Sequence, residues 1–144
     1  MIEQDTIRLL RECDAGVQMG VESIDDVLPR VRDEKLKELL LRCKKEHEAL
    51  DREIQRELAS YHDEGKEPNM MAEGMSKLKT EMKMRFSDKD ATVASLMTDG
   101  CNMGVKSLSR YLNEYEAADE KSKDIAKRLI SLEERLAEDM RDFL

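Results

Sequence analysis

The chain has 144 residues, of which 40% are charged and only 3% aromatic, and its formal net charge is −8. This composition is typical of one helical domain with solvated outer faces, so we expect a single domain over residues 1–144. The negative charge argues against nucleic acid and anionic membranes as partners. No apolar run approaches the roughly 18 residues of a transmembrane helix. Three cysteines without paired spacing, and an acidic N-terminus unlike a signal peptide, favour a cytoplasmic protein with free thiols.

One nine-residue stretch occurs twice: residues 16–24 return as residues 100–108, with five identical positions. Each copy contains two glycines four residues apart, which are Gly16 and Gly20 in the first copy and Gly100 and Gly104 in the second. A glycine inside a helix costs about 1 kcal/mol relative to alanine, so these positions need a compensating reason. A spacing of four places each pair on one helix face. We expect these glycines to allow close helix packing; the alternative is a ligand or a bulky side chain lying over a flat patch.

Apolar residues in steps of three and four predict four helices, over 3–31, 34–62, 88–115 and 119–143. Pro29 is expected to end or kink the first helix, and Asp33 to cap the second. Ser87 is the predicted N-cap of the third helix, with Asp90 in the capping-box position. A methionine-rich apolar edge predicts a further short helix over 70–86, in the connection between the second and third helices.

The repeat continues beyond the glycines, because residues 33–35 (Asp-Glu-Lys) recur as residues 119–121. The first two helices and the last two therefore look like two copies of one antiparallel hairpin, and a four-helix bundle gives both hairpins a common core. A helix of ~17 residues spans ~25 Å, and about five extended residues add ~16 Å. The connection is thus long enough to cross the bundle, which predicts an up-down-down-up order of helices.

With its repeated hairpin and long crossover, the chain resembles the ferritin-like four-helix bundles, especially small uncharacterised bacterial members of that superfamily. The resemblance implies a pseudo-two-fold axis relating the first helix to the third. The first and third helices would then be antiparallel neighbours, with Gly16 opposite Gly104 and Gly20 opposite Gly100.

The ferritin-like di-iron centre uses glutamates together with Glu-x-x-His motifs, and this sequence has no such motif. The residues three positions before its two histidines, His47 and His62, are Lys44 and Ala59. The resemblance therefore does not carry ferroxidase, oxygenase or peroxidase activity over to this chain.

Polar residues on the apolar faces mark a candidate site in the middle of the bundle. Its candidate metal ligands are Asp14, His47, Cys101 and Glu133, which would hold zinc or iron. The alternative is a metal-free hydrogen-bonded cluster that fixes the helix register, in which Asp14 pairs with His47 or Lys106.

These observations favour a metal-free interaction or assembly module that forms a dimer or binds an unidentified protein partner. No complete catalytic motif is present, which argues against an enzyme. The first alternative is a metal-binding, redox-related protein that uses the polar residues. The second is a small-molecule binder that uses the space above the glycines.

Overall fold

The computed structural model describes residues 2–63 and 89–144, which form four α-helices and no strand. The helices are α1 (Ile2–Val27), α2 (Glu34–Ser60), α4 (Asp90–Glu114) and α5 (Glu120–Met140). Short 3-10 helices follow α1 at Leu28–Arg30 and α5 at Arg141–Phe143. The all-helical class predicted from the sequence is confirmed. The predicted helix over 70–86 and the predicted cap Ser87 lie outside the described residues.

Local chemistry explains most of the helix ends. Pro29 lies inside the 3-10 turn after α1, where its missing N–H breaks the α-helical pattern. Asp33 caps α2 by accepting a hydrogen bond from the Leu36 amide at 3.0 Å, as predicted. Asp119 caps α5 in the same way through the Ser122 amide at 2.8 Å. The second helix of each hairpin therefore begins at the same type of aspartate N-cap.

Asp90 has a different role from the predicted one. Its two carboxylate oxygens accept hydrogen bonds from the backbone amides of Arg32 and Asp33, each at 2.9 Å. The residue before it, Lys89, is the N-cap of α4 and makes no side-chain capping bond. Asp90 therefore ties the connection between α1 and α2 to the beginning of α4.

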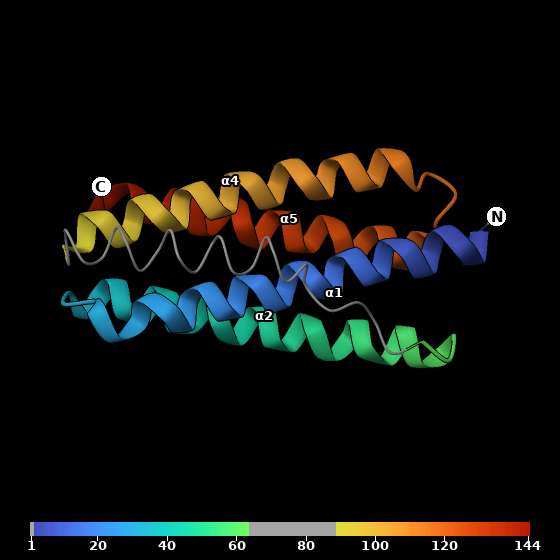
Figure 1. Ribbon diagram of the computed structural model, residues 1–144, viewed down its shortest axis with the longest axis horizontal. Helices are drawn as coiled ribbons and strands as arrows, with labels where there is room; N and C mark the ends of the chain where they lie inside the picture. The colour runs from blue at the N-terminus through green and yellow to red at the C-terminus, as the bar shows by residue number, and fades with distance from the viewer. Residues whose placement is uncertain (1, 64–88) are drawn as a thin grey trace.

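The opposite end of the bundle is tied in a similar way. The amide of Asp119 donates to Thr6 Oγ1 at 2.8 Å, and the amide of Ala117 donates to Asp5 Oδ2 at 3.1 Å. Tyr61, at the end of α2, donates to Asp119 at 3.3 Å. The start of α1, the end of α2 and the α4–α5 connection thus share one end. The helices α2 and α4 both begin at the other end, and the two hairpins lie side by side (Figure 1).

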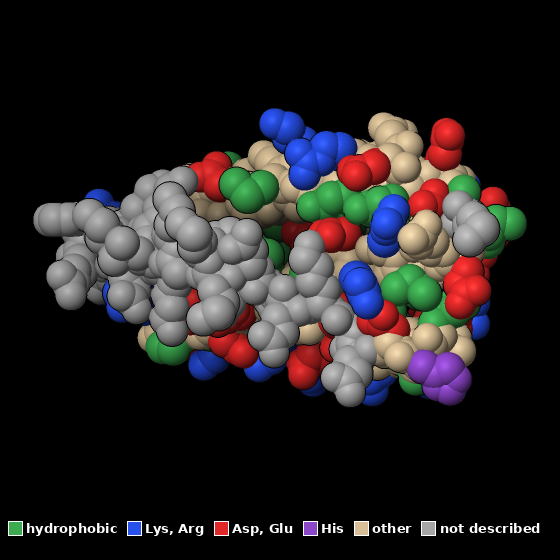
Figure 2. Space-filling model, turned by 45° about the vertical axis from the view of Figure 1, so that its right-hand side comes forward, with side chains coloured by type: hydrophobic (Ala, Val, Ile, Leu, Met, Phe, Trp, Pro, Cys, Tyr) green, Lys and Arg blue, Asp and Glu red, His purple; other side chains and the backbone are tan. Residues whose placement is uncertain are grey.

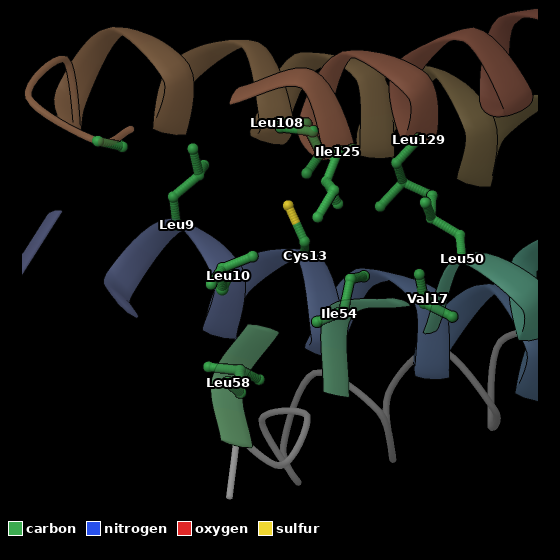
Figure 3. Close-up of a cluster of buried hydrophobic side chains, with 12 residues drawn as sticks. Leu9, Leu10, Cys13, Val17, Leu50, Ile54, Leu58, Leu108, Ile125 and Leu129 are labelled. Carbon is green, nitrogen blue, oxygen red and sulfur yellow. The ribbon is translucent and has the colours of Figure 1, made fainter. Parts of the chain in front are cut away.

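The core consists of two apolar clusters along the bundle axis. One lies towards the α4–α5 connection and contains Leu9, Leu10, Ile54, Ile125 and Leu129, all fully buried (Figure 3). The other lies towards the α1–α2 connection and contains Ile24, Leu36, Leu40 and Met140, also fully buried. Each such side chain contributes about 1.5–3 kcal/mol to folding. Between the two clusters lies a layer of polar residues.

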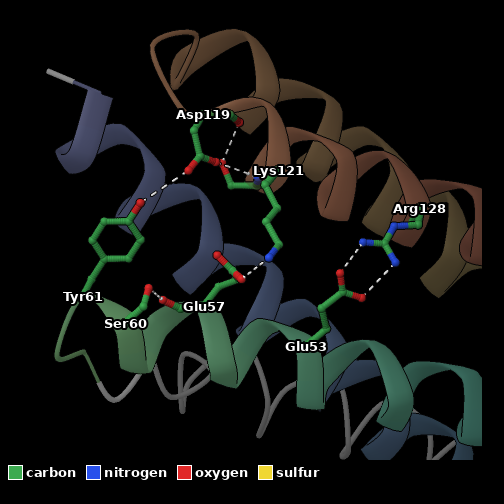
Figure 4. Close-up of polar contacts among 8 residues, drawn as sticks. Glu53, Glu57, Ser60, Tyr61, Asp119, Lys121 and Arg128 are labelled. Atoms are coloured by element: carbon green, nitrogen blue, oxygen red, sulfur yellow. Dashed lines mark hydrogen bonds and ion pairs between the residues drawn. The ribbon is translucent and has the colours of Figure 1, made fainter.

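Charged residues cover most of the outside. Lysines, arginines, aspartates and glutamates are interspersed with apolar side chains over the coloured part of the face that Figure 2 draws. Arg128 binds Glu53 through two hydrogen bonds of 2.9 and 2.7 Å, and Lys121 contacts Glu57 at 2.6 Å, both between α2 and α5 (Figure 4). Exposed ion pairs of this kind contribute about 0–1 kcal/mol each, so they support the packing of α2 on α5 without dominating it. In the described ranges, no helix combines the length and the apolar character needed to cross a membrane.

Candidate functional site: a buried polar layer

The polar layer is centred on a contact between α2 and α5. His47 Nε2 lies 3.0 Å from Glu133 Oε1, and the two side chains are separated by 86 residues in the sequence. His47 is 1% exposed and Glu133 is 9% exposed. A charged carboxylate at this depth requires a paired partner, and the imidazole supplies it.

The bonds around His47 define its protonation. Its Nδ1 lies 2.8 Å from the backbone carbonyl oxygen of Cys43, one turn earlier in α2. A carbonyl oxygen only accepts, so Nδ1 carries a hydrogen. Burial lowers the pKa of His47, but its contacts with Cys43 and Glu133 outweigh that effect and raise the pKa above its ordinary value. His47 is therefore an imidazolium paired with the Glu133 carboxylate, and both ring nitrogens donate to partners inside the protein.

Two glycines complete this layer from the other two helices. A Cβ atom added to Gly20 in α1 would lie 3.1 Å from His47 Cδ2 and Nε2. A Cβ atom added to Gly104 in α4 would lie 3.6 Å from the Glu133 carboxyl group. Each helix thus contributes one residue: α1 and α4 give glycines, α2 the imidazole and α5 the carboxylate. The glycines make room for the ion pair.

The structure places the remaining glycines differently from the prediction. A Cβ atom on Gly16 would meet Leu129 in α5 at 3.7 Å, an ordinary van der Waals distance. A Cβ atom on Gly100 would meet no atom of the described residues within 4 Å. The glycines of α1 and α4 therefore do not face one another at these positions. The sequence offered two explanations for the glycines, close helix packing or a group lying over a flat patch. Gly20 and Gly104 fit the second explanation, because bulky side chains lie over both of them.

Two thiols border the ion pair. Cys43 Sγ lies 3.4 Å from His47 Nδ1. Burial first, and then the charge of Glu133 and a hydrogen bond to it, raise the pKa of Cys101 far above its ordinary value. Cys13 lies apart in the other apolar cluster, where burial raises its pKa to about 12. A protonated, buried thiol is a poor nucleophile, so Cys101 and Cys13 act as apolar core residues.

Asp14, the fourth candidate ligand, does not join this cluster. Its Oδ1 accepts a hydrogen bond from Gln55 Nε2 at 2.7 Å, and its other carboxyl contact is with Asp51. Asp51 lies about one turn after His47 in α2, and Gln55 lies about two turns after it. The predicted partner Lys106 is exposed on α4. The structure thus brings together His47, Cys101 and Glu133 and adds Cys43, while Asp14 belongs to a separate polar cluster.

Sequence reasoning missed three participants: Cys43, Asp51 and Gln55. A signal for Cys43 was present, because its spacing of four from His47 places both on one face of α2. Asp51 and Gln55 border the apolar face of α2, and such flanking positions usually point to solvent. Their burial depends on how closely α1 packs, which sequence periodicity does not report.

The layer does not fit a di-iron centre. Gly20 and Gly104 have no ligand atom, so neither α1 nor α4 supplies the carboxylate that a di-iron centre needs at this level, and the single carboxylate of the layer is already bonded to the histidine. Across residues 2–63 and 89–144, no three histidine, cysteine, aspartate or glutamate side chains are grouped so that they could hold a metal ion. The second histidine, His62, is exposed in the turn after α2.

Comparison with known proteins gave no match for this chain among protein-family models, curated proteins or solved structures. The arrangement of the described residues must therefore support any functional conclusion by itself.

Proposed function

We propose that the protein is a metal-free, ferritin-like helical bundle that acts as an interaction or assembly module and not as an enzyme. The ferritin-like assignment is supported by the common starting end of α2 and α4 and by the repeat. Gly20 matches Gly104 in the repeat, and His47 matches Glu133; all four lie in one layer. Two copies of one hairpin related by a pseudo-two-fold axis would place equivalent residues in this way.

One observation carries the non-enzymatic part of this proposal: the polar layer is closed. Both nitrogens of His47 are bonded within the chain, and Glu133 accepts from His47. General acid–base or nucleophilic catalysis requires such a group within hydrogen-bonding reach of a substrate. Here the titratable groups hold helices together instead.

The outer face of α4 supports a role in association. The helix carries only five charged residues among 25: Asp90, Asp99, Lys106, Arg110 and Glu114. Met103 is 67% exposed, and Gly100, one turn earlier, faces open space among the described residues. Protein interfaces are depleted of charge at their centre and enriched in methionine. Two copies packed antiparallel through α4 would each place Met103 over Gly100 of the other copy, giving a self-complementary contact.

Sedimentation equilibrium over a range of protein concentrations tests this association. We expect a reversible dimer whose affinity rises with salt, because salt screens repulsion between chains of charge −8. Replacing Met103 by Glu should weaken the dimer at least about tenfold, since burying a methionine contributes roughly 1.5–3 kcal/mol. Replacing the exposed Ala49 of α2 by Glu adds the same charge and should have a much smaller effect. A monomer at every concentration, or equal effects of the two substitutions, would contradict the proposal.

Metal binding is a second candidate function, and one observation favours it. The side chains of Cys43, His47, Glu133 and Cys101 form a continuous chain of contacts, and all four belong to residue types that bind zinc or iron. In the described residues no three of them are grouped around one point, so metal binding would also require them to move. A metal ion would have to replace the proton between His47 and Glu133 and the thiol proton of Cys101.

Elemental mass spectrometry on protein purified without chelator separates the two functions. The metal-free proposal expects far less than one equivalent of zinc, iron or manganese. Near-stoichiometric metal that is lost in Glu133→Gln and retained in Asp14→Asn would instead establish the second function, because only Glu133 belongs to the layer. Metal retained in both variants would place it outside the layer.

A further inference from the structure

A second polar cluster lies between α1 and α2, separate from the histidine layer. Asp14 is 1% exposed, and its carboxylate accepts from Gln55 Nε2 at 2.7 Å. The carboxyl group of Asp51 lies within hydrogen-bonding reach of Asp14. Asp51 Oδ1 is shielded from solvent, yet it has no hydrogen-bond partner among the described residues.

We propose that Asp14 and Asp51 hold one shared proton between α1 and α2, and that release of this proton weakens the packing of the two helices. Two ionised carboxylates can only accept hydrogen bonds, so neither could donate to the other. A single proton between them turns a repulsive contact into a hydrogen bond, as in other carboxyl pairs that share one site. It would also satisfy Asp51 Oδ1, the one carboxyl oxygen of the pair that is buried without a partner among the described residues.

Among residues 2–63 and 89–144, no hydrogen bond or ion pair joins a cation to either carboxyl group of the pair. Gln55, which donates to Asp14, is neutral. The groove beside Asp51, of about 500 Å³, is lined by Glu22 and Asp25 from α1 and by Glu48 and Arg52 from α2. The ammonium group of Lys44 is bound to Asp25 at 2.7 Å.

The other two helices bring no free cation to the pair either. From α5, Glu133 is bound to His47, one turn of α2 before Asp51. From α4, the candidate cation in the sequence repeat, Lys106, is exposed. The charged groups that the described helices place around the carboxyl pair are therefore predominantly negative, which favours retention of the proton.

The titration of Asp51 gives the direction of the pH effect. Burial raises its pKa, the neighbouring Asp14 raises it further and the bond from Gln55 lowers it, leaving the pKa at about 6. The unfolded chain would titrate near 3.8. The folded state therefore binds more protons between these values, and stability falls as the pH rises through that window. The contribution is fully present below about 3.8 and lost above about 6.

Replacing Asp51 by Asn tests the shared proton, because the Asn amide can donate permanently to Asp14. In the wild-type protein, carbon-13 NMR of labelled aspartates should show one carboxyl group titrating near pH 6, about two units above an ordinary aspartate. This signal should be missing from Asp51→Asn. Urea unfolding should give a wild-type midpoint that is lower at pH 8 than at pH 5. The raised pKa of His47 lowers the midpoint of both proteins above about pH 6.5. The midpoint of the variant should therefore fall less than that of the wild type between pH 5 and pH 8, and it should exceed the wild-type midpoint at pH 8.

The exposed Glu48, which lines the same groove, supplies the matched control. Glu48→Gln removes the same charge and should leave both the aspartate titration and the pH dependence of unfolding unchanged. The proposal fails if no aspartate of the wild-type protein titrates above pH 5, a measurement that does not depend on any variant folding. It also fails if Asp51→Asn is less stable than the wild type at pH 8.

Discussion

Replacing Glu133 by Ala should lower the free energy of unfolding by about 3–5 kcal/mol, which is a large part of the stability of a small domain. The substitution leaves the His47 imidazolium 1% exposed and without its carboxylate. It also opens a cavity beside Gly104, whose nearest neighbour atoms belong to Glu133. Urea unfolding followed by circular dichroism at pH 7 measures the loss. The adjacent Glu134 is exposed, so Glu134→Ala should change stability by no more than about 0.5 kcal/mol.

A double substitution separates the cost of breaking the pair from the worth of having it. Changing His47 to Leu and Glu133 to Met removes both charges while keeping similar volume. Replacing a buried ion pair by apolar residues is often neutral or stabilising. We therefore expect the double variant to be clearly more stable than Glu133→Ala. If Glu133→Ala costs no more than Glu134→Ala, the pair does not exist as described and the layer must be rearranged in solution.

If the double variant folds well, the ion pair must serve specificity more than stability. An apolar layer would let α2 and α5 slide by one turn, because leucine, isoleucine and methionine can replace one another along both helices. A bond between His47 and Glu133 permits one register only. Gly20 and Gly104 favour the same register, because a Cβ atom at either position would lie against His47 or Glu133.

The sequence predicted the helices well because helix signals are local. Asp33 before α2 and the proline after α1 act within one turn of their own position, so the predicted boundaries differ from the observed ones by a few residues at most. The polar residues on the apolar helix faces were also predicted correctly, because Asp14, His47 and Glu133 are all buried. Periodicity shows which face of a helix is buried, and this is enough to predict that a polar residue on that face is buried.

Register between helices is not local, and it accounts for the errors. Asp14 was assigned to the histidine layer, but it contacts α2 at Asp51 and Gln55 instead. A shift of about one helical turn, some 5.4 Å, separates the two arrangements. The glycines show the same limit. Their spacing identified a helix face that a neighbouring group approaches closely. It could not identify that group, because His47 and Glu133 belong to α2 and α5.

Replacing Gly20 by Ala should destabilise the protein, and replacing Gly100 by Ala should stabilise it, although both are helix-interior glycines of the repeated stretch. Alanine favours a helix by about 1 kcal/mol at both positions. At Gly100 the new methyl group meets no described atom within 4 Å, so that gain should be realised in full. At Gly20 the methyl group would lie 3.1 Å from the His47 ring.

The sign at Gly20 depends on whether His47 can move, and its bonds indicate that it cannot. Nδ1 is held by the Cys43 carbonyl at 2.8 Å and Nε2 by Glu133 at 3.0 Å, so a shift of the ring would weaken one of two buried bonds. Overpacking of this kind costs about 1–3 kcal/mol, which exceeds the helix gain. Thermal and urea unfolding of both variants, with Gly16→Ala as a third, measure the difference. Stabilisation by Gly20→Ala comparable to that by Gly100→Ala would show that His47 is not fixed against α1.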